Sequence, residues 1–171
     1  PNRNGDVEAS QCAQAAAARA RGVGRMTAPR DARRRLVWHG VLMVLVGLLI
    51  GTVTSSMANP RMGLSAHVGT LLNGTLLVAL GAAWEVVVLS PPAAALGCWL
   101  LVLGSWGGCV GLVLAALFGT HESTPIHGGA MAVARWQETL VSGMLTVPGI
   151  AVLIGTAIVF AGLRRRPPPA G

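Results

Sequence analysis

The sequence contains no lysine and no tyrosine, and only 11% of its 171 residues are charged. An ordinary soluble domain has about 25% charged residues, so this composition excludes a water-soluble globule. The formal net charge of +7 comes entirely from arginine, and most arginines lie near the two ends of the chain, outside its apolar middle. We therefore interpret the positive charge as a signal of membrane topology and expect no nucleic-acid partner.

Cysteine is also scarce, with three residues in the whole chain. No CxxCH motif occurs, which excludes covalent attachment of a c-type haem, and no CxxC pair indicates a zinc ribbon. Cys98 and Cys109 belong to one apolar stretch, and on a helix their separation is about 16 Å. That distance excludes a disulfide bond between them.

Long apolar stretches fill the middle of the chain. Residues 1–35 are rich in alanine, arginine and glycine and predict a flexible tail, and residues 164–171 predict a second, basic and proline-rich tail. The sequence between them, residues 36–163, predicts an all-α integral membrane domain, a bundle of four transmembrane helices. Each helix has the roughly 20 residues that a bilayer requires, and the predicted spans are 36–57, 64–89, 93–118 and 138–162.

The distribution of arginine predicts how this bundle is oriented. Arginines are concentrated before the first span and after the fourth, whereas the first and third connections contain one each, Arg61 and Arg135. Because arginine-rich segments stay on the cytoplasmic side, we predict that both termini are cytoplasmic. His39 then lies near the inner end of the first span and His67 near the outer end of the second, on the order of 25 Å apart.

Few polar side chains lie within the predicted spans, and each is a candidate functional residue because burial in hydrocarbon is costly. His67 is either a metal or haem ligand or an interfacial histidine bonded to a carbonyl. Asn73 either orients a substrate or makes an interhelical hydrogen bond. Glu85 is either a proton-coupling acid or the partner of a lipid headgroup or an arginine. The remaining candidates are His39, which we interpret as interfacial, Ser105, Trp106 and Glu138.

Residues 58–74, ANPRMGLSAHVGTLLNG, resemble the bacterial hydroxylaminobenzene mutases. The resemblance extends over about residues 36–163. More distantly, an Ala-His pair followed six residues later by Asn-Gly is similar to the arrangement in styrene oxide isomerase, a small membrane isomerase with four spans. Three short fragments also fit the mutase family: His39-Gly40, Phe118-Gly119-Thr120 and Trp136-Gln137-Glu138.

The resemblance implies a multi-pass isomerase of the bacterial inner membrane. Such an enzyme converts a small aromatic substrate, an arylhydroxylamine, to an aminophenol by moving the hydroxyl group from nitrogen to the ring. From styrene oxide isomerase, the resemblance further implies a homotrimer that binds ferric haem b between subunits. His67 would be the axial ligand and Asn73 would line the substrate site, with ferric iron acting as a Lewis acid.

The predicted catalytic residues are Asn73, Ser105 and Glu138. Ser105 and Val113 stand where styrene oxide isomerase has an aspartate and a tyrosine in its substrate site, so the polar contribution of the third helix must differ here.

Two alternatives stay open. One is a small four-helix transporter or efflux subunit in which Glu85 is the coupling acid. The other is the same isomerase with a non-haem metal bound by His67, His121 and His127.

Overall fold

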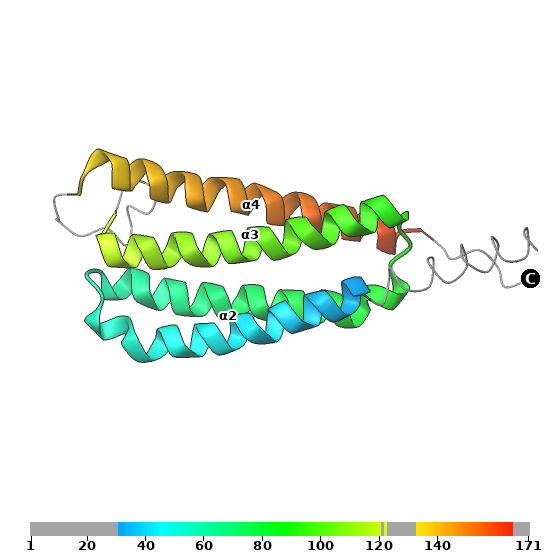
Figure 1. The fold of residues 1–171 in the computed structure, drawn as a ribbon, viewed down its shortest axis with the longest axis horizontal. Helices are drawn as coiled ribbons and strands as arrows, with labels where there is room; N and C mark the ends of the chain where they lie inside the picture. The colour runs from blue at the N-terminus through cyan, green and yellow to red at the C-terminus, as the bar shows by residue number, and fades with distance from the viewer. Residues whose placement is uncertain (1–30, 121, 123–132, 166–171) are drawn as a thin grey trace, which may run out of the picture.

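The structure is a computed structural model that describes residues 31–120, 122 and 133–165. Every regular element within these residues is helical, and four helices are long and apolar enough to cross a membrane (Figure 1). This confirms the predicted all-α architecture with four candidate spans. In chain order the elements are a first helix (residues 31–53), η1 (Thr54–Ser56), α2 (Pro60–Ala82), η2 (Ala83–Val86), α3 (Pro91–Phe118) and α4 (Arg135–Leu163).

Each long helix begins earlier than the hydropathy pattern predicts. The predicted second span begins at residue 64, but Asn59 is the N-cap of α2 and Pro60 its first residue. The Asn59 side chain accepts a hydrogen bond from the Met62 backbone N–H at 3.2 Å, which satisfies one of the donors left open at a helix start. The first turn of α2 contains Pro60 and Arg61, which lower its hydropathy, so the hydropathy pattern places its start too late.

Glycines allow the helices to approach closely. A Cβ added at Gly40 would lie 2.7 Å from the Gly74 carbonyl oxygen, and one added at Gly74 would lie 2.8 Å from the Gly40 carbonyl oxygen. The first helix and α2 therefore touch backbone to backbone at this point. α3 and α4 meet in the same way, since a Cβ at Gly104 would lie 2.8 Å from the Pro148 carbonyl oxygen. Small residues at such crossings are typical of helix packing in membranes.

We expect Gly40→Ala to destabilise the bundle by about 1–3 kcal/mol, the usual cost of overpacking a tight contact. Its methyl group would press on backbone atoms of α2 that cannot rotate away. The matched control is Gly143→Ala, because nothing lies within 4 Å of a Cβ at that position. Thermal unfolding of both variants in detergent provides the measurement. Equal melting temperatures for the two variants would contradict the close packing.

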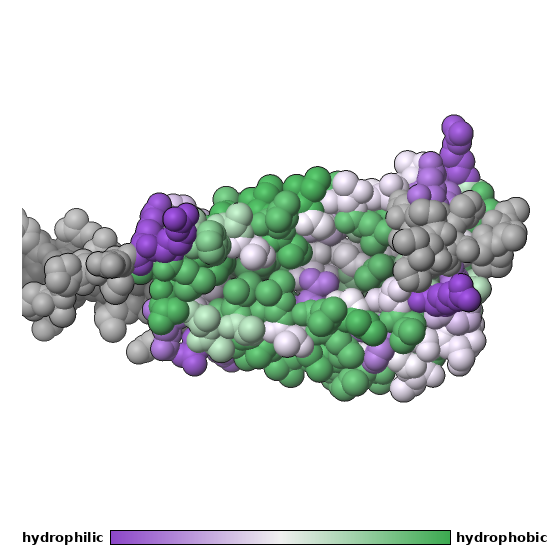
Figure 2. Space-filling view, turned by 180° about the vertical axis from the view of Figure 1, so that it is seen from behind, coloured by the Kyte–Doolittle hydropathy of each residue, from purple (hydrophilic) through white to green (hydrophobic). Residues whose placement is uncertain are grey.

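The surface of the bundle matches a membrane environment. Hydrophobic residues cover most of its middle, and hydrophilic residues gather at the two ends (Figure 2). Residue 31 and residue 165 lie at the same end of the bundle, which we call the terminal end (Figure 1). The side of the membrane that this end faces stays a prediction.

Candidate functional site

His67 lies on α2 and packs against the first helix. Its Nδ1 is 2.7 Å from the Gly47 carbonyl oxygen, and a Cβ added at Gly51 would lie 2.7 Å from the same nitrogen. Because a carbonyl oxygen only accepts hydrogen bonds, Nδ1 is the donor in this contact, and in the neutral imidazole the lone pair is then on Nε2. The bond to a carbonyl that one of the two interpretations of His67 expected is therefore present. It also fixes the tautomer in which a histidine ligates a metal through Nε2.

His67 is closer to His39 along the bundle than the sequence predicts. Gly47 and Gly51, which flank the His67 ring, are about 12 and 18 Å along the first helix from His39 at 1.5 Å per residue. The expected separation of about 25 Å was too large, because α2 begins at Pro60 and His67 therefore lies two turns inside it. The two histidines are still too far apart to bind one metal ion in the same chain.

Asn73 and Ser105, both predicted as catalytic, lie next to each other at the contact between α2 and α3. The Ser105 Oγ donates to Asn73 Oδ1 at 3.5 Å, and Asn73 Nδ2 donates to the Gly69 carbonyl oxygen at 3.0 Å. Ser105 is only 1% exposed, whereas Asn73 is half-buried. The side-chain amide of asparagine has two N–H donors. The bond to Gly69 uses one of them, and the other can donate to a second group.

His39 and Trp106 form a second polar contact at a similar depth. Trp106 Nε1 donates to His39 Nδ1 at 3.2 Å, and the neighbouring Gly40 packs against Gly74, next to Asn73. The His39 side chain is half-buried and faces α3, and its position at the membrane interface stays a prediction. No spacing in the sequence indicates which helix face His39 occupies. Together these side chains form the central polar cluster, defined as His39, Asn73, Ser105 and Trp106.

Glu138 lies away from this cluster, at the start of α4. Its side chain is 7% exposed, and Oε2 accepts a hydrogen bond from the Glu122 backbone N–H at 3.1 Å. Glu122 follows the end of α3, which is about 20 Å along that helix from Ser105. The structure therefore does not bring Glu138 to Asn73 and Ser105, and its catalytic role stays a prediction.

The side chain of Glu85 forms an ion pair with Arg33 at the terminal end of the bundle. Both side chains are exposed. This matches the arginine partner that the sequence allowed for Glu85. A coupling acid of a transporter is expected to lie within the membrane, facing the bundle interior or a water-filled cavity, so the position of Glu85 does not favour transport.

The non-haem alternative involves two histidines, His121 and His127, that lie outside the described residues. Among the residues that the structure describes, no three His, Cys, Asp or Glu side chains form a group that could hold a metal ion. Cys98 and Cys109 are both free thiols, as their helical separation predicts.

A family model described as styrene oxide isomerase matches residues 32–164. The chain belongs to the styrene oxide isomerase family. Two relatives from Ectopseudomonas oleovorans are similar to this member of the family. Hydroxylaminobenzene mutase HabB is 34% identical over 135 residues, which cover 78% of this chain and 82% of the relative. Hydroxylaminobenzene mutase HabA is 31% identical over 127 residues, which cover 68% of this chain and 92% of the relative.

These matches confirm the family resemblance found in the sequence and make the chain a member of an isomerase family. The match to the styrene oxide isomerase family extends over all four long helices. These include the first helix, α2 and α3, which contribute His67 and the central polar cluster. His67 and Asn73, the two residues of the motif, lie on different faces of α2. His67 faces the first helix, and Asn73 faces α3. Six residues turn a helix by about 600°, which accounts for this divergence.

Proposed function

We propose that the chain is a membrane-embedded arylhydroxylamine mutase, which converts a substrate such as hydroxylaminobenzene to an aminophenol. The observation that carries this proposal is its similarity to two hydroxylaminobenzene mutases over most of their lengths. The rearrangement balances without a cosubstrate. The N–O bond breaks, a C–O bond forms at the ring, the ring carbon loses a proton and the nitrogen gains one.

We propose that His67 would hold ferric haem b by ligating its iron. The fit is supported by the bond between His67 Nδ1 and the Gly47 carbonyl, which leaves Nε2 as the nitrogen with a lone pair. The imidazole is half-buried in one chain, which is compatible with a cofactor that a second subunit helps to enclose and thus with a homotrimer. Bound ferric haem would supply a Lewis acid for the heteroatom of the substrate.

Asn73 is the residue that we propose to orient the substrate. Its remaining amide N–H can donate to the hydroxylamine group, while the bonds to Gly69 and Ser105 hold the amide plane. Ser105 is the positioning residue for Asn73 in this arrangement. The surrounding helices are apolar, so they exclude water and keep the migrating hydroxyl group away from solvent.

The proposed location is the bacterial inner membrane, with both termini in the cytoplasm. Four apolar helices support the multi-pass arrangement, and the arginines near both ends of the apolar domain support the orientation. An aryl substrate of low polarity can reach the bundle from the lipid phase, which gives a physical reason for a membrane-bound mutase.

We expect the purified protein to convert hydroxylaminobenzene to aminophenol without taking up oxygen from the solvent. The hydroxyl group stays with the bound molecule in an intramolecular rearrangement, so a reaction in ¹⁸O-labelled water should give unlabelled aminophenol by mass spectrometry. The matched control is the acid-promoted reaction without protein, in which water attacks a released cation. Label in the enzymatic product at the level of this control would overturn the intramolecular mechanism.

A further inference from the structure

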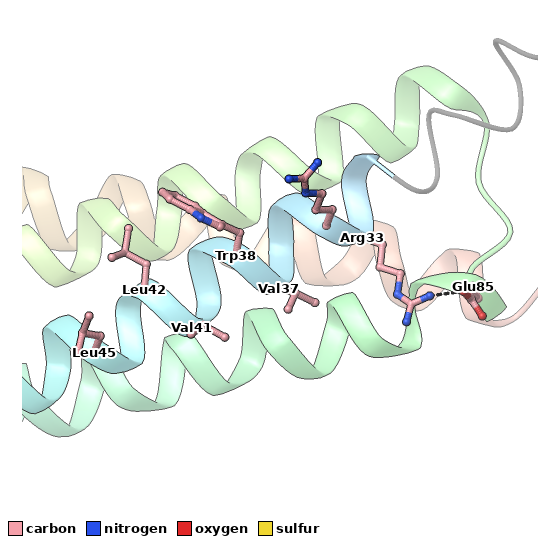
Figure 3. A pocket seen from close by; sticks show the side chains of 8 residues that line it. Arg33, Val37, Trp38, Val41, Leu42, Leu45 and Glu85 are labelled. Atoms are coloured by element: carbon pink, nitrogen blue, oxygen red, sulfur yellow. Dashed lines mark hydrogen bonds and ion pairs between the residues drawn. The ribbon is translucent and has the colours of Figure 1, made fainter.

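A groove on the outer face of the first helix lies apart from the central polar cluster. Its volume is about 860 Å³, and Figure 3 shows its side chains along the first helix, with Glu85 of η2 reaching Arg33. Charged residues occupy one end of the groove, and apolar residues form the rest. The lining residues are Arg33, Arg34, Val37, Trp38, Val41, Leu42, Leu45 and Glu85.

The apolar part of the groove follows one stripe of the first helix. Trp38, Val41 and Leu45 are spaced three and four residues apart, which places them on one helix face, and they are 59%, 56% and 54% exposed. From Arg34 to Leu45 the stripe extends about 16 Å along the helix axis. Such an elongated apolar surface matches an extended acyl chain better than a compact aromatic molecule.

The charged end of the groove is positive. Arg33 is paired with Glu85, and no carboxylate among the described residues forms an ion pair with Arg34. Two arginines and one glutamate give the lining a net charge of +1. Asp31 lines a neighbouring hollow together with Arg34 and Arg35. Trp38 lies one turn further along, where tryptophan is typical of the membrane–water interface.

The groove and the proposed cofactor site are separate places. His67 meets the first helix at Gly47, which is about 20 Å along the helix from Arg34. At its other end the groove reaches Leu45, two residues from Gly47, but two residues turn a helix by about 200° and place Leu45 on nearly the opposite face. A ligand in the groove therefore does not need to contact His67, and its binding can be tested independently of the mutase reaction.

We propose that this groove binds one anionic phospholipid, with its phosphate at Arg34 and one acyl chain along Trp38, Val41 and Leu45. The proposal depends on the chain lying in a bilayer but not on its being a mutase. Arginine next to the apolar part of a membrane helix attracts anionic headgroups. The apolar stripe then buries the acyl chain that a headgroup site alone would leave in bulk lipid.

The test is native mass spectrometry of the full chain, equilibrated with equal amounts of phosphatidylglycerol and phosphatidylcholine. The wild type should retain phosphatidylglycerol preferentially. Arg34→Gln should lower that retention about fivefold, the value of one arginine near an anionic headgroup. Arg165→Gln is the matched control, because Arg165 is exposed at the same terminal end but outside the groove, and it should retain lipid like the wild type.

Val41→Trp tests the apolar part of the same groove. The larger side chain should occupy the groove and reduce the retention of both lipids, while the subunit number in the same spectra stays unchanged. Equal retention of the two lipids by the wild type, or equal loss in Arg34→Gln and Arg165→Gln, would overturn the proposal. A fall in subunit number in Val41→Trp would instead identify a second copy of the chain as the occupant and would overturn it too.

Discussion

His67→Ala should abolish the Soret absorption of the purified protein and lower arylhydroxylamine mutase activity by more than about 100-fold, since even residues that only support a metal ligand change activity by 10- to 100-fold. The variant removes the nitrogen that we propose as the haem ligand and leaves the Gly47 carbonyl without its partner. The absorption spectrum and the rate of aminophenol formation provide the two measurements. Added imidazole should restore part of the Soret band by occupying the vacated position.

Two further variants separate loss of the ligand from loss of the fold. His39→Ala should keep the Soret band, because His39 bonds to Trp106 and not to the His67 region. Gly51→Ala keeps His67 but places a methyl carbon 2.7 Å from its Nδ1 atom, so it should weaken haem retention without removing the ligand. If the wild type is active without Soret absorption, or if His67→Ala has a normal spectrum, the haem proposal is wrong. The metal site with His121 and His127 would then be the hypothesis to test.

The four helices could be predicted from the sequence because bilayer thickness imposes one dominant constraint, about 20 apolar residues per span. Helix ends were predicted less well. Asn59 and Pro60 are turn residues by type, yet together they form the N-cap and first position of α2, a use that their local chemistry allows equally well. Because α2 begins at Pro60 and not at residue 64, His67 lies deeper in this helix than the sequence predicts.

The contacts of individual polar residues depended on helix rotation, which hydropathy does not encode. Large hydrophobic residues lie on the exposed faces, such as Leu45 and Leu103, as well as on the buried faces, such as Leu36 and Leu101, so hydropathy does not distinguish the two faces. The sequence therefore identified Asn73 and Ser105 as candidates by cost of burial, and their contact followed only from the packing of α2 on α3. The bond between His39 and Trp106 could not be predicted for the same reason, because it joins helices distant in the sequence.

The groove with Arg34 was missed for a different reason. Its walls come from the first helix and from Glu85, which follows α2, and the sequence alone indicated only that Glu85 could meet an arginine. The arginine run was interpreted as part of a tail, whereas the first helix begins at residue 31 and includes it. A basic run within a helix presents its charges on defined faces, which a run in a tail does not.

Asn73→Ala should retain the Soret band but lower kcat by about 100-fold, the usual loss when one hydrogen-bond donor to a reacting group is removed. The proposed role of Asn73 is to orient the hydroxylamine group, and its side chain does not share the helix face of His67. Haem content and turnover should therefore separate in this variant, whereas they fall together in His67→Ala. Stopped assays of aminophenol formation, scaled to the haem content of each preparation, provide the measurement.

Ser105→Ala is the control that distinguishes orientation of the substrate from packing of α2 on α3. Ser105 contacts Asn73 Oδ1 at 3.5 Å, a long hydrogen bond that contributes less than a short one, so its loss should lower kcat by only about tenfold or less. If both positions serve only to pack the helices, the two variants should lose thermal stability and leave turnover per haem intact. A large loss of turnover in Asn73→Ala, at a melting temperature equal to that of Ser105→Ala, assigns the amide to the substrate.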